Sequence, residues 1–200
     1  MDATGIAHYV DWIEGQLLEA RRVQEAIREL TPTLVEIALR MVRVFREGGR
    51  VYLFGNGGSA ADAQHWAAEL SGRFYLNRPA LPAIALTTNT SQLTAIGNDF
   101  GYEWVFARPL AGLLERRDMV IGISTSGSSP NVIRAFEVAR SVGAVTVGFT
   151  GATGGELRAL CDYLVAIPSM DVARIQEGHE LCGHLICAIV ERELFGKEVP

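Results

Sequence analysis

One helical face in the first half of the sequence carries three side chains that can take part in acid–base or metal chemistry. Asp62, His65 and Glu69 fall together on a helix predicted over residues 59–71, because spacings of three and four bring side chains to one face. A carboxylate can remove a proton, an imidazole titrates near neutrality, and both bind metal ions. A solvated helix face is the alternative interpretation. The row begins at a glycine-rich loop, which keeps both interpretations open.

The last long helix, predicted over residues 172–195, carries a second polar row. Gln176, Glu180 and His184 recur at spacings of four, opposite an apolar face, with His179 near the edge of the row. Farther along, the same side becomes apolar and carries Cys187, Val190 and Leu194. A helix that is apolar on all sides is normally buried on all sides, which here indicates a subunit interface. The polar row can then face a pocket instead of water.

The loop "GNGGSA" at residues 55–60 joins a predicted strand to the first polar helix. It fits the pattern G-x-G-x-x-A of dinucleotide-binding proteins. That pattern needs an acidic residue at the end of the next strand, but this strand ends in "LTTNT" at residues 86–90. The sequence also lacks the G-K-[ST] of nucleotide P-loops. Neither kind of nucleotide site is therefore predicted.

A second loop, "STSGSSPN" at residues 124–131, also joins a strand to a helix. Hydroxyl groups and backbone N–H groups gather there at a helix N-terminus, where the helix dipole favours an anion. A single serine would be explained as an ordinary helix N-cap. The concentration of hydroxyl side chains favours a phosphate site instead. Those side chains are Ser124, Thr125, Ser126, Ser128 and Ser129.

These loops belong to a pattern in which short apolar strands alternate with helices. Continuous apolar strands separated by helices predict an α/β fold, with a parallel sheet covered on both faces. Ligands of such folds bind at the carboxyl ends of the strands, where both loops lie. The predicted strands are 51–54, 83–86, 119–124, 145–150 and 163–167. Helices are predicted at 5–29, 33–48, 59–71, 91–96, 103–115, 131–142, 155–160 and 172–195.

The composition excludes several classes of protein. A formal net charge of −5 argues against general nucleic-acid binding, which needs Lys and Arg to neutralise phosphates. No apolar run is long enough to cross a bilayer, and the N-terminus has no signal-peptide pattern. The 3 cysteines form no C-x-x-C pair and no even framework. We therefore expect a cytoplasmic protein with reduced cysteines and with neither nucleic acid nor a membrane as partner.

Five sequence blocks, in this order, resemble the sugar isomerase (SIS) family: "GNGGSAADAQHWAAEL", "RPALPAIAL", "TAIGNDFGYEWVFARPL", "GISTSGSSPNVIRA" and "RIQEGHELCGHLI". The resemblance implies a three-layer α/β/α sandwich around a five-stranded parallel sheet. It also implies an N-terminal helical oligomerisation segment at 1–48, a single SIS domain at 49–200, and a homotetramer with active sites between subunits. Within the family, the blocks are most similar to members that act on heptose phosphates.

The resemblance also implies roles for individual residues. Substrate contacts are implied for Asn56, Gly57, Gly58, Ser59, Glu69, Asn98, Asp99 and Gln176. Phosphate contacts are implied for Ser124, Thr125, Ser126 and Ser129. One zinc ion per subunit is implied, with His65, Glu69, Gln176 and His184 as its ligands. Glu69 and His184 correspond to the acid–base pair.

The implied activity is aldose–ketose isomerisation of sedoheptulose 7-phosphate to D-glycero-D-manno-heptose 7-phosphate through an enediol, the first step toward nucleotide-activated heptose. Glu69 would move the proton between the two carbons and His184 would manage protons on their oxygens. The zinc and acid–base roles of Glu69 are in tension, because a metal-bound carboxylate is a weaker base. Glutamine is also an unusual zinc ligand.

Two alternatives belong to other functional classes. One is a non-catalytic SIS-domain protein that associates with the replication initiator DnaA, but such a protein does not keep equivalents of both Glu69 and His184. The other is a regulator that senses sugar phosphates through an attached DNA-binding domain. The leading residues 1–48 are too short and too acidic to favour that arrangement.

Overall fold

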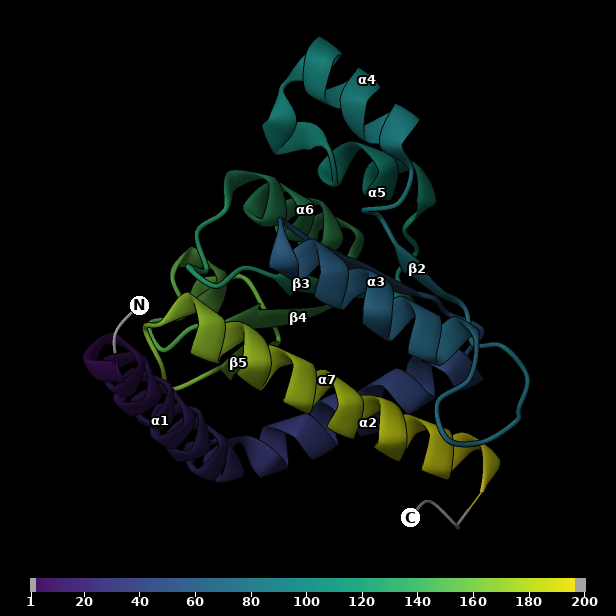
Figure 1. The fold of residues 1–200 in the computed structure, drawn as a ribbon. Coiled ribbons are helices and arrows are strands. Elements are labelled where there is room, and N and C mark those ends of the chain that lie inside the picture. Colours follow the sequence, from purple (N-terminus) through teal and green to yellow (C-terminus); the bar gives the residue numbers. More distant parts are fainter. Residues whose placement is uncertain (1–2, 197–200) are drawn as a thin grey trace.

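Five apolar segments form one parallel sheet in the order β2-β1-β3-β4-β5. The computed structural model describes residues 3–196 and is drawn in Figure 1. In the register of the sheet, Val51 at the start of β1 lies opposite Ala83 of β2 and Met119 of β3. The predicted five-stranded parallel sheet is therefore confirmed. The strands are β1 Val51–Gly55, β2 Ala83–Ala85, β3 Met119–Ile123, β4 Val145–Thr150 and β5 Tyr163–Ala166.

Helices cover both faces of the sheet, as Figure 1 shows. Helices α2, α3 and α7 pack on one face, while α4, α5 and α6 pack on the other. This arrangement confirms the predicted three-layer α/β/α fold. The helices are α1 Ala3–Ala26, α2 Thr31–Arg46, α3 Gly58–Ser71, α4 Thr90–Phe100, α5 Ala107–Leu113, α6 Pro130–Val142 and α7 Val172–Phe195.

The central strand β1 shows why its sequence is continuously apolar. Successive side chains of a strand point to opposite faces, and here both faces are covered. Leu53 joins the cluster under α3 and α7, which includes Trp66. Phe54 joins the opposite cluster, where its ring meets that of Phe136 edge-on at a centroid distance of 6.1 Å. Burial on both sides fixes the strand end from which the first ligand loop begins.

The leading helices differ from each other in burial. A 3-10 turn, Ile27–Leu30, separates α1 from α2, and Pro32 follows in the first turn of α2. Helix α2 places Ile37, Met41 and other apolar side chains in the core, packed against α7. Helix α1 instead leaves apolar side chains between 48% and 65% exposed, among them Ile6, Tyr9, Val10, Ile13 and Leu17. The domain boundary between 48 and 49 stays a prediction.

The prediction of one helix over 103–115 is wrong. The structure has a 3-10 turn at Tyr102–Trp104 and then the short helix α5. Pro109 explains the break, because proline has no N–H for a helical hydrogen bond and is tolerated only within a first turn. The helix therefore begins just before Pro109.

Two shorter predicted helices also differ from the structure. The helix predicted at 91–96 is longer in the structure, where it forms α4. The Asn89 side chain caps this helix by accepting a hydrogen bond from the backbone N–H of Gln92. The segment predicted at 155–160 is a 3-10 turn, Glu156–Ala159. Gly154 and Gly155 precede it with φ angles of 77° and 52°, which delay the start of any helix.

Candidate active site

The glycine loop after β1 lies against the last helix. Gly57 has a φ of 58°, which favours glycine, and it is the N-cap residue of α3. A Cβ atom on Gly58 would collide with the side-chain amide of Gln176 in α7. Ser59 is buried beneath the turn. The two glycines thus allow this loop to turn sharply and let Gln176 approach its backbone, which brings α7 to the carboxyl end of β1.

Asn56 ties the first loop to the second. Its amide nitrogen donates to Asn131 Oδ1 at 2.9 Å, and the amide nitrogen of Asn131 donates back to Asn56 Oδ1 at 2.8 Å. The Tyr102 hydroxyl also donates to Asn56 Oδ1, at 3.3 Å. These residues border a cavity of about 500 Å³ that Ser129 also lines. Asn56 therefore holds the two predicted ligand loops at one edge of the sheet.

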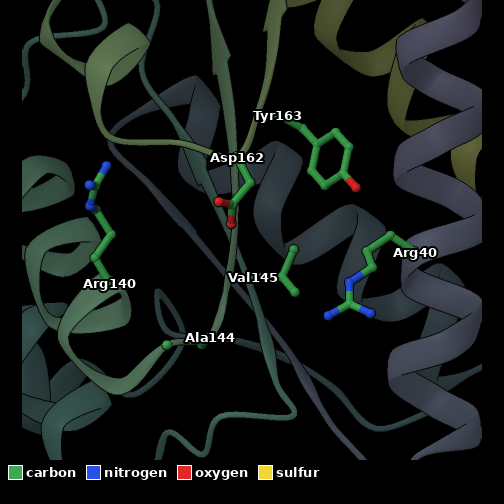
Figure 2. Close-up of a pocket in the computed structure, with 7 residues that line it drawn as sticks. Arg40, Arg140, Ala144, Val145, Asp162 and Tyr163 are labelled. Carbon is green, nitrogen blue, oxygen red and sulfur yellow. The ribbon is translucent and has the colours of Figure 1, made fainter.

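A second cavity, of about 490 Å³, lies at the opposite end of the strands. Figure 2 shows Arg40 and Arg140 approaching it from two different helices, with Asp162 and Tyr163 between them. Val145, the first residue of β4, also lines it, so this cavity opens at the amino ends of the strands. Ligands of parallel α/β sheets bind at the carboxyl ends. The candidate site is therefore the edge that carries the two loops.

The hydroxyl loop after β3 gathers its side chains inward. The buried Ser124 hydroxyl lies 2.8 Å from the Ser129 hydroxyl and 3.3 Å from that of Ser126. Gly127 has a φ of 68° and packs closely on the backbone of Gly154. Ser129 is the N-cap residue of α6 but makes no side-chain capping bond. Capping alone therefore does not explain the serines, and their grouping before α6 suits an anion.

The two polar rows of the sequence meet where α3 packs against α7. The rings of His65 and His184 have centroids 5.0 Å apart. Glu180 Oε1 lies 2.6 Å from His65 Nδ1 and 3.0 Å from His184 Nε2. Each of these three side chains offers one atom that could bind a metal ion, and the three atoms all lie within 4.8 Å of one another. Among residues 3–196, they are the group of His, Cys, Asp or Glu side chains with this geometry. The pair His65 and His184 was predicted, whereas no role was predicted for Glu180.

Glu180 was visible in the sequence as part of the polar row of α7. Its spacing of four from both Gln176 and His184 is the signal that could have identified it. Its Oε2 accepts a hydrogen bond from Trp66 Nε1 at 3.0 Å, so the indole anchors one oxygen while the other faces the histidines. The orientation of Glu180 is fixed by Trp66 of α3, and the spacing of residues along α7 alone does not reveal this contact.

Of the remaining predicted residues, Glu69 lies beside this group, whereas Asn98 and Asp99 belong to a helix on the other face of the sheet. Glu69 is half-buried, and its Oε1 lies 3.2 Å from His65 Nε2, on the other side of the ring from Glu180. Asn98 and Asp99 are exposed on α4, where the Asn98 amide donates to the Asp99 carboxylate at 2.8 Å. Their roles stay predictions. His179 is buried with Nε2 3.0 Å from the carbonyl of Thr150, and burial lowers its pKa to about 4.

Negative charge accumulates beside the two histidines. Asp62 Oδ2 and Glu180 Oε1 are both buried without a hydrogen-bond donor. Burial, and then the charge of Glu180, raises the pKa of Asp62 to about 6. Two imidazoles with an excess of buried carboxylate oxygen match the ligand preferences of a divalent transition metal such as zinc. The side chains present therefore fit a metal ion.

A buried ion pair holds α3 and α7 together beyond this group. Arg78 donates to Glu191 Oε1 at 3.0 Å, and the two side chains are 2% and 1% exposed. Arg78 also donates to the backbone carbonyls of Glu69 and Leu70, at 2.7 and 2.6 Å. Glu191 additionally accepts the backbone N–H groups of Phe74, Tyr75 and Leu76. The pair thus fixes the end of α3 that carries Glu69.

Replacing Glu191 with Gln is expected to lower the free energy of unfolding by about 3–5 kcal/mol, because the buried Arg78 guanidinium loses its countercharge. Burial raises the pKa of Glu191, but the backbone N–H groups and Arg78 outweigh it and lower this pKa overall. A lowered folded-state pKa stabilises the fold above the ordinary carboxyl pKa, and the effect is lost as the pH falls through the folded-state value. Urea unfolding at neutral and acid pH measures both effects.

Glu193→Gln on the same helix is the matched control, since its side chain is exposed. We expect that variant to unfold like the wild type. An unchanged unfolding midpoint for Glu191→Gln would mean that the ion pair does not stabilise the packing of α3 on α7.

The parallel sheet, the paired strand-end loops and the hydroxyl cluster before α6 define a class of protein. The sequence model of the SIS domain matches residues 17–151, so this chain is a SIS-domain protein. It is 50% identical over 190 residues to a phosphoheptose isomerase of Burkholderia pseudomallei, covering 94% of this chain and 96% of the relative. It is 55% identical over 186 residues to a phosphoheptose isomerase of Roseiflexus sp., covering 93% of each.

A solved structure agrees with these relatives. Phosphoheptose isomerase GmhA from Neisseria gonorrhoeae superimposes with a TM-score of 0.86 at 40% identity, covering 92% of this chain and 98% of that one. The similarity therefore extends over nearly the whole length of both chains. The chain belongs to the phosphoheptose isomerase family of SIS-domain proteins.

Proposed function

We propose that this chain is an aldose–ketose isomerase that converts sedoheptulose 7-phosphate into D-glycero-D-manno-heptose 7-phosphate, the first step toward nucleotide-activated heptose. The observation that carries the proposal is the near-full-length match to relatives named phosphoheptose isomerase. The local chemistry agrees with it, since the chain has both a hydroxyl loop suited to phosphate and a carboxylate beside two imidazoles.

The proposed reaction moves a proton between neighbouring carbons. Glu69 takes a proton from C1 of the ketose, the electrons of that C–H bond form the C1=C2 double bond, and the C2 oxygen gains a proton. The resulting enediol loses the proton of its C1 hydroxyl, so that the C1 carbonyl forms while Glu69 returns its proton to C2. His184 shuttles the protons of the two oxygens, a role that suits an imidazole because its ring nitrogens can both accept and donate a proton.

The phosphate loop has a positioning role in this proposal. Ser124, Thr125, Ser126 and Ser129 hold the phosphate end of the open-chain sugar. Their binding energy places the distant reacting carbons beside Glu69. The proton transfer then takes place between groups that are already held in the correct orientation. Arg78 donates to the backbone carbonyl of Glu69 and to Glu191 of α7, and so fixes the position of Glu69 along α7.

One zinc ion per subunit is part of the proposal. His65 and His184 are its expected imidazole ligands, and the sequence resemblance adds Glu69 and Gln176. When bound, the ion supplies Lewis-acid polarisation of the substrate oxygens. The unpartnered buried oxygens of Asp62 and Glu180 support a cation at this place, because each gains a favourable countercharge from it.

We further propose a cytoplasmic homotetramer whose active sites lie between subunits. The apolar face of α1 supports an interface, because apolar side chains gathered on one helix face are normally covered. His65 and His184 are 46% and 37% exposed in the single chain, so a neighbouring subunit has room to complete the site. Free cysteines suit the cytoplasm. Among residues 3–196, the helices include none with the length and apolar character to cross a bilayer.

The two alternatives from the sequence are not favoured. The relatives that match over nearly the whole chain are named as isomerases. The carboxylate and imidazole needed for catalysis, Glu69 and His184, are both present, and they extend from helices packed against each other. A non-catalytic partner of DnaA has no need for that pairing.

Incubation of the purified protein with sedoheptulose 7-phosphate, followed by NMR, tests the proposed function. We expect signals of an aldoheptose 7-phosphate to appear and to reach equilibrium with the ketose. A zinc-replete protein that leaves the heptulose unchanged, with no exchange of its C1 protons in D₂O, would exclude the isomerase.

Replacing Ser124 and Ser126 together with Ala is expected to raise KM for the sugar phosphate by about 10²–10⁴-fold, because two hydrogen bonds to a charged group are lost and each is worth about 1.5–3 kcal/mol. The effect on kcat is expected to be smaller. Steady-state kinetics measure both constants. Ser141→Ala, at an exposed serine bonded to the Val138 carbonyl in α6, is the matched control. An unchanged KM in the double variant would place the phosphate elsewhere.

A further inference from the structure

We propose that the cavity at the amino ends of the strands, between α2 and α6, is a second binding site, whose ligand is a phosphate ester that carries hydroxyl groups. A sugar phosphate and a nucleotide share this chemistry. The cavity lies at the opposite end of the sheet from the glycine and hydroxyl loops, so this site is separate from the candidate active site. The inference goes beyond the proposed function and does not depend on it.

The first argument is positive charge that no carboxylate neutralises. Arg40 of α2 and Arg140 in the last turn of α6 approach the cavity from two sides (Figure 2). Arg116 adds a third guanidinium group, since its Cγ would lie 3.6 Å from a Cβ atom on Gly143, which also lines the cavity. Among residues 3–196, none of the three arginines forms an ion pair. In a chain of net charge −5, such a grouping favours an anionic ligand.

The second argument is the number of free donors. Arg140 Nη1 donates to the backbone carbonyl of Ala159 at 3.0 Å, which orients this guanidinium and leaves its other N–H groups available. The guanidinium of Arg40 donates no hydrogen bond within the described part of the chain. Each guanidinium has five N–H donors, and charge-assisted hydrogen bonds from arginine are well suited to phosphate oxygens.

The third argument concerns Asp162, the carboxylate that lines the cavity between the two arginines. Its Oδ2 accepts hydrogen bonds from the backbone N–H and the hydroxyl of buried Thr146, at 2.8 and 3.0 Å, which fix it at the sheet edge. Its Oδ1 accepts none from residues 3–196. A free carboxylate oxygen repels a bare anion but accepts a hydrogen bond from a hydroxyl group. Asp162 therefore favours a phosphate ester of a polyol over inorganic phosphate.

The size of the cavity agrees with such a ligand. Its volume of about 490 Å³ is within the usual range of small-molecule sites, about 300–1,000 Å³. Tyr163 places its aromatic ring on the wall between β5 and α2, as Figure 2 shows. This wall can pack against the carbon skeleton of the ligand while the arginines hold the phosphate.

Binding of ribose 5-phosphate, measured by isothermal titration calorimetry at low ionic strength, tests the site. The starting protein is the variant with Ser124→Ala and Ser126→Ala, in which phosphate binding at the hydroxyl loop is weakened. Adding Arg40→Gln and Arg140→Gln is expected to lower the remaining affinity by at least about 100-fold, because each charge-assisted hydrogen bond is worth about 1.5–3 kcal/mol. Arg43→Gln, at an exposed arginine of α2 that does not line the cavity, is the matched control and should change the affinity by less than about 3-fold.

Arg40→Gln alone separates binding from folding. Its side chain makes no hydrogen bond among residues 3–196, so the variant is expected to melt like the starting protein and to bind ribose 5-phosphate about 10-fold more weakly. Asp162→Asn is expected to reduce the preference for ribose 5-phosphate over inorganic phosphate by about 10-fold, through loss of the charged acceptor. AMP distinguishes the two sources of the ligand, because tighter binding than that of ribose 5-phosphate would identify a nucleotide and weaker binding a sugar phosphate.

The proposal is overturned if ribose 5-phosphate does not bind the starting protein, or if the two arginine changes leave its affinity unchanged. Equal loss of affinity in Arg43→Gln would also overturn it, since general positive charge would then explain the binding. In the otherwise wild-type protein, Arg40→Gln with Arg140→Gln is expected to keep its turnover of sedoheptulose 7-phosphate. Loss of that turnover in a folded variant would contradict a separate site. A wild type without turnover whose arginines still bind ribose 5-phosphate would overturn the proposed function alone.

Discussion

Replacing Glu69 with Gln is expected to lower kcat by about 10²–10⁴-fold, the usual contribution of a general base. The amide keeps the shape and the contact with His65 but cannot take up a proton. Substrate binding is expected to survive, because the hydroxyl loop before α6 is unchanged. Steady-state kinetics with sedoheptulose 7-phosphate measure kcat, and isothermal titration measures binding.

Solvent exchange gives this prediction a second readout. In D₂O the wild type is expected to incorporate deuterium at the reacting carbons, because the proton resides on Glu69 during the enediol step. Glu69→Gln is expected to lose exchange and turnover together. His184→Ala is expected to lose turnover as well. Glu36→Gln, at an exposed glutamate of α2, is a suitable control for the loss of a charge. Undiminished exchange in Glu69→Gln would assign the proton transfer to another group.

The architecture was predictable because its signals are local. Each strand is a short apolar run, and α6 is bounded by Pro130 at its start and Gly143, with a φ of 80°, at its end. Proline and glycine mark helix ends in this way because the φ angle of proline is restricted and that of glycine is not. Pro109 was a signal of the same kind, but the apolar residues around it suggested a longer helix than the chain forms.

The meeting of α3 and α7 could be predicted only in part. Helical spacing placed His65 on one face of its helix and His184 on one face of another, and the structure brings their rings together. The position of Glu180 depends on Trp66, which lies 114 residues away in sequence and belongs to a different helix. Spacing along one helix carries no information about a donor on another, so the carboxylate that joins both histidines was not identified.

The same limit applies to Gln176 and Glu191. The sequence shows Gln176 on a polar helix face, but only the packing of α7 on the glycine loop explains why Gly58 must lack a side chain. In the sequence, Glu191 resembles an ordinary charged residue near a helix end. Its burial follows from the fold of residues 72–82, which present three backbone N–H groups and Arg78 to it.

Introducing charge on the apolar face of α1 is expected to dissociate the proposed tetramer and remove most of the activity. Ile13 and Leu17 are 50% and 65% exposed and one turn apart on that face. Burying an unpaired carboxylate in an apolar interface costs several kcal/mol, so Ile13→Glu with Leu17→Glu should favour smaller species. Light scattering coupled to size-exclusion chromatography measures the mass, and kcat/KM is measured on the same fractions.

Gly15→Glu is the matched control for this helix. Gly15 lies on the opposite, polar side of α1, and a side chain added there meets nothing within 4 Å. This variant is expected to remain tetrameric and active, which separates the effect of charge from the effect of its position. Loss of activity on dissociation, with the circular dichroism spectrum unchanged, would support active sites completed by a neighbouring subunit. A double variant that stays tetrameric would mean that the apolar face of α1 is not the interface. A dissociated variant with full activity would mean that each subunit holds a complete site.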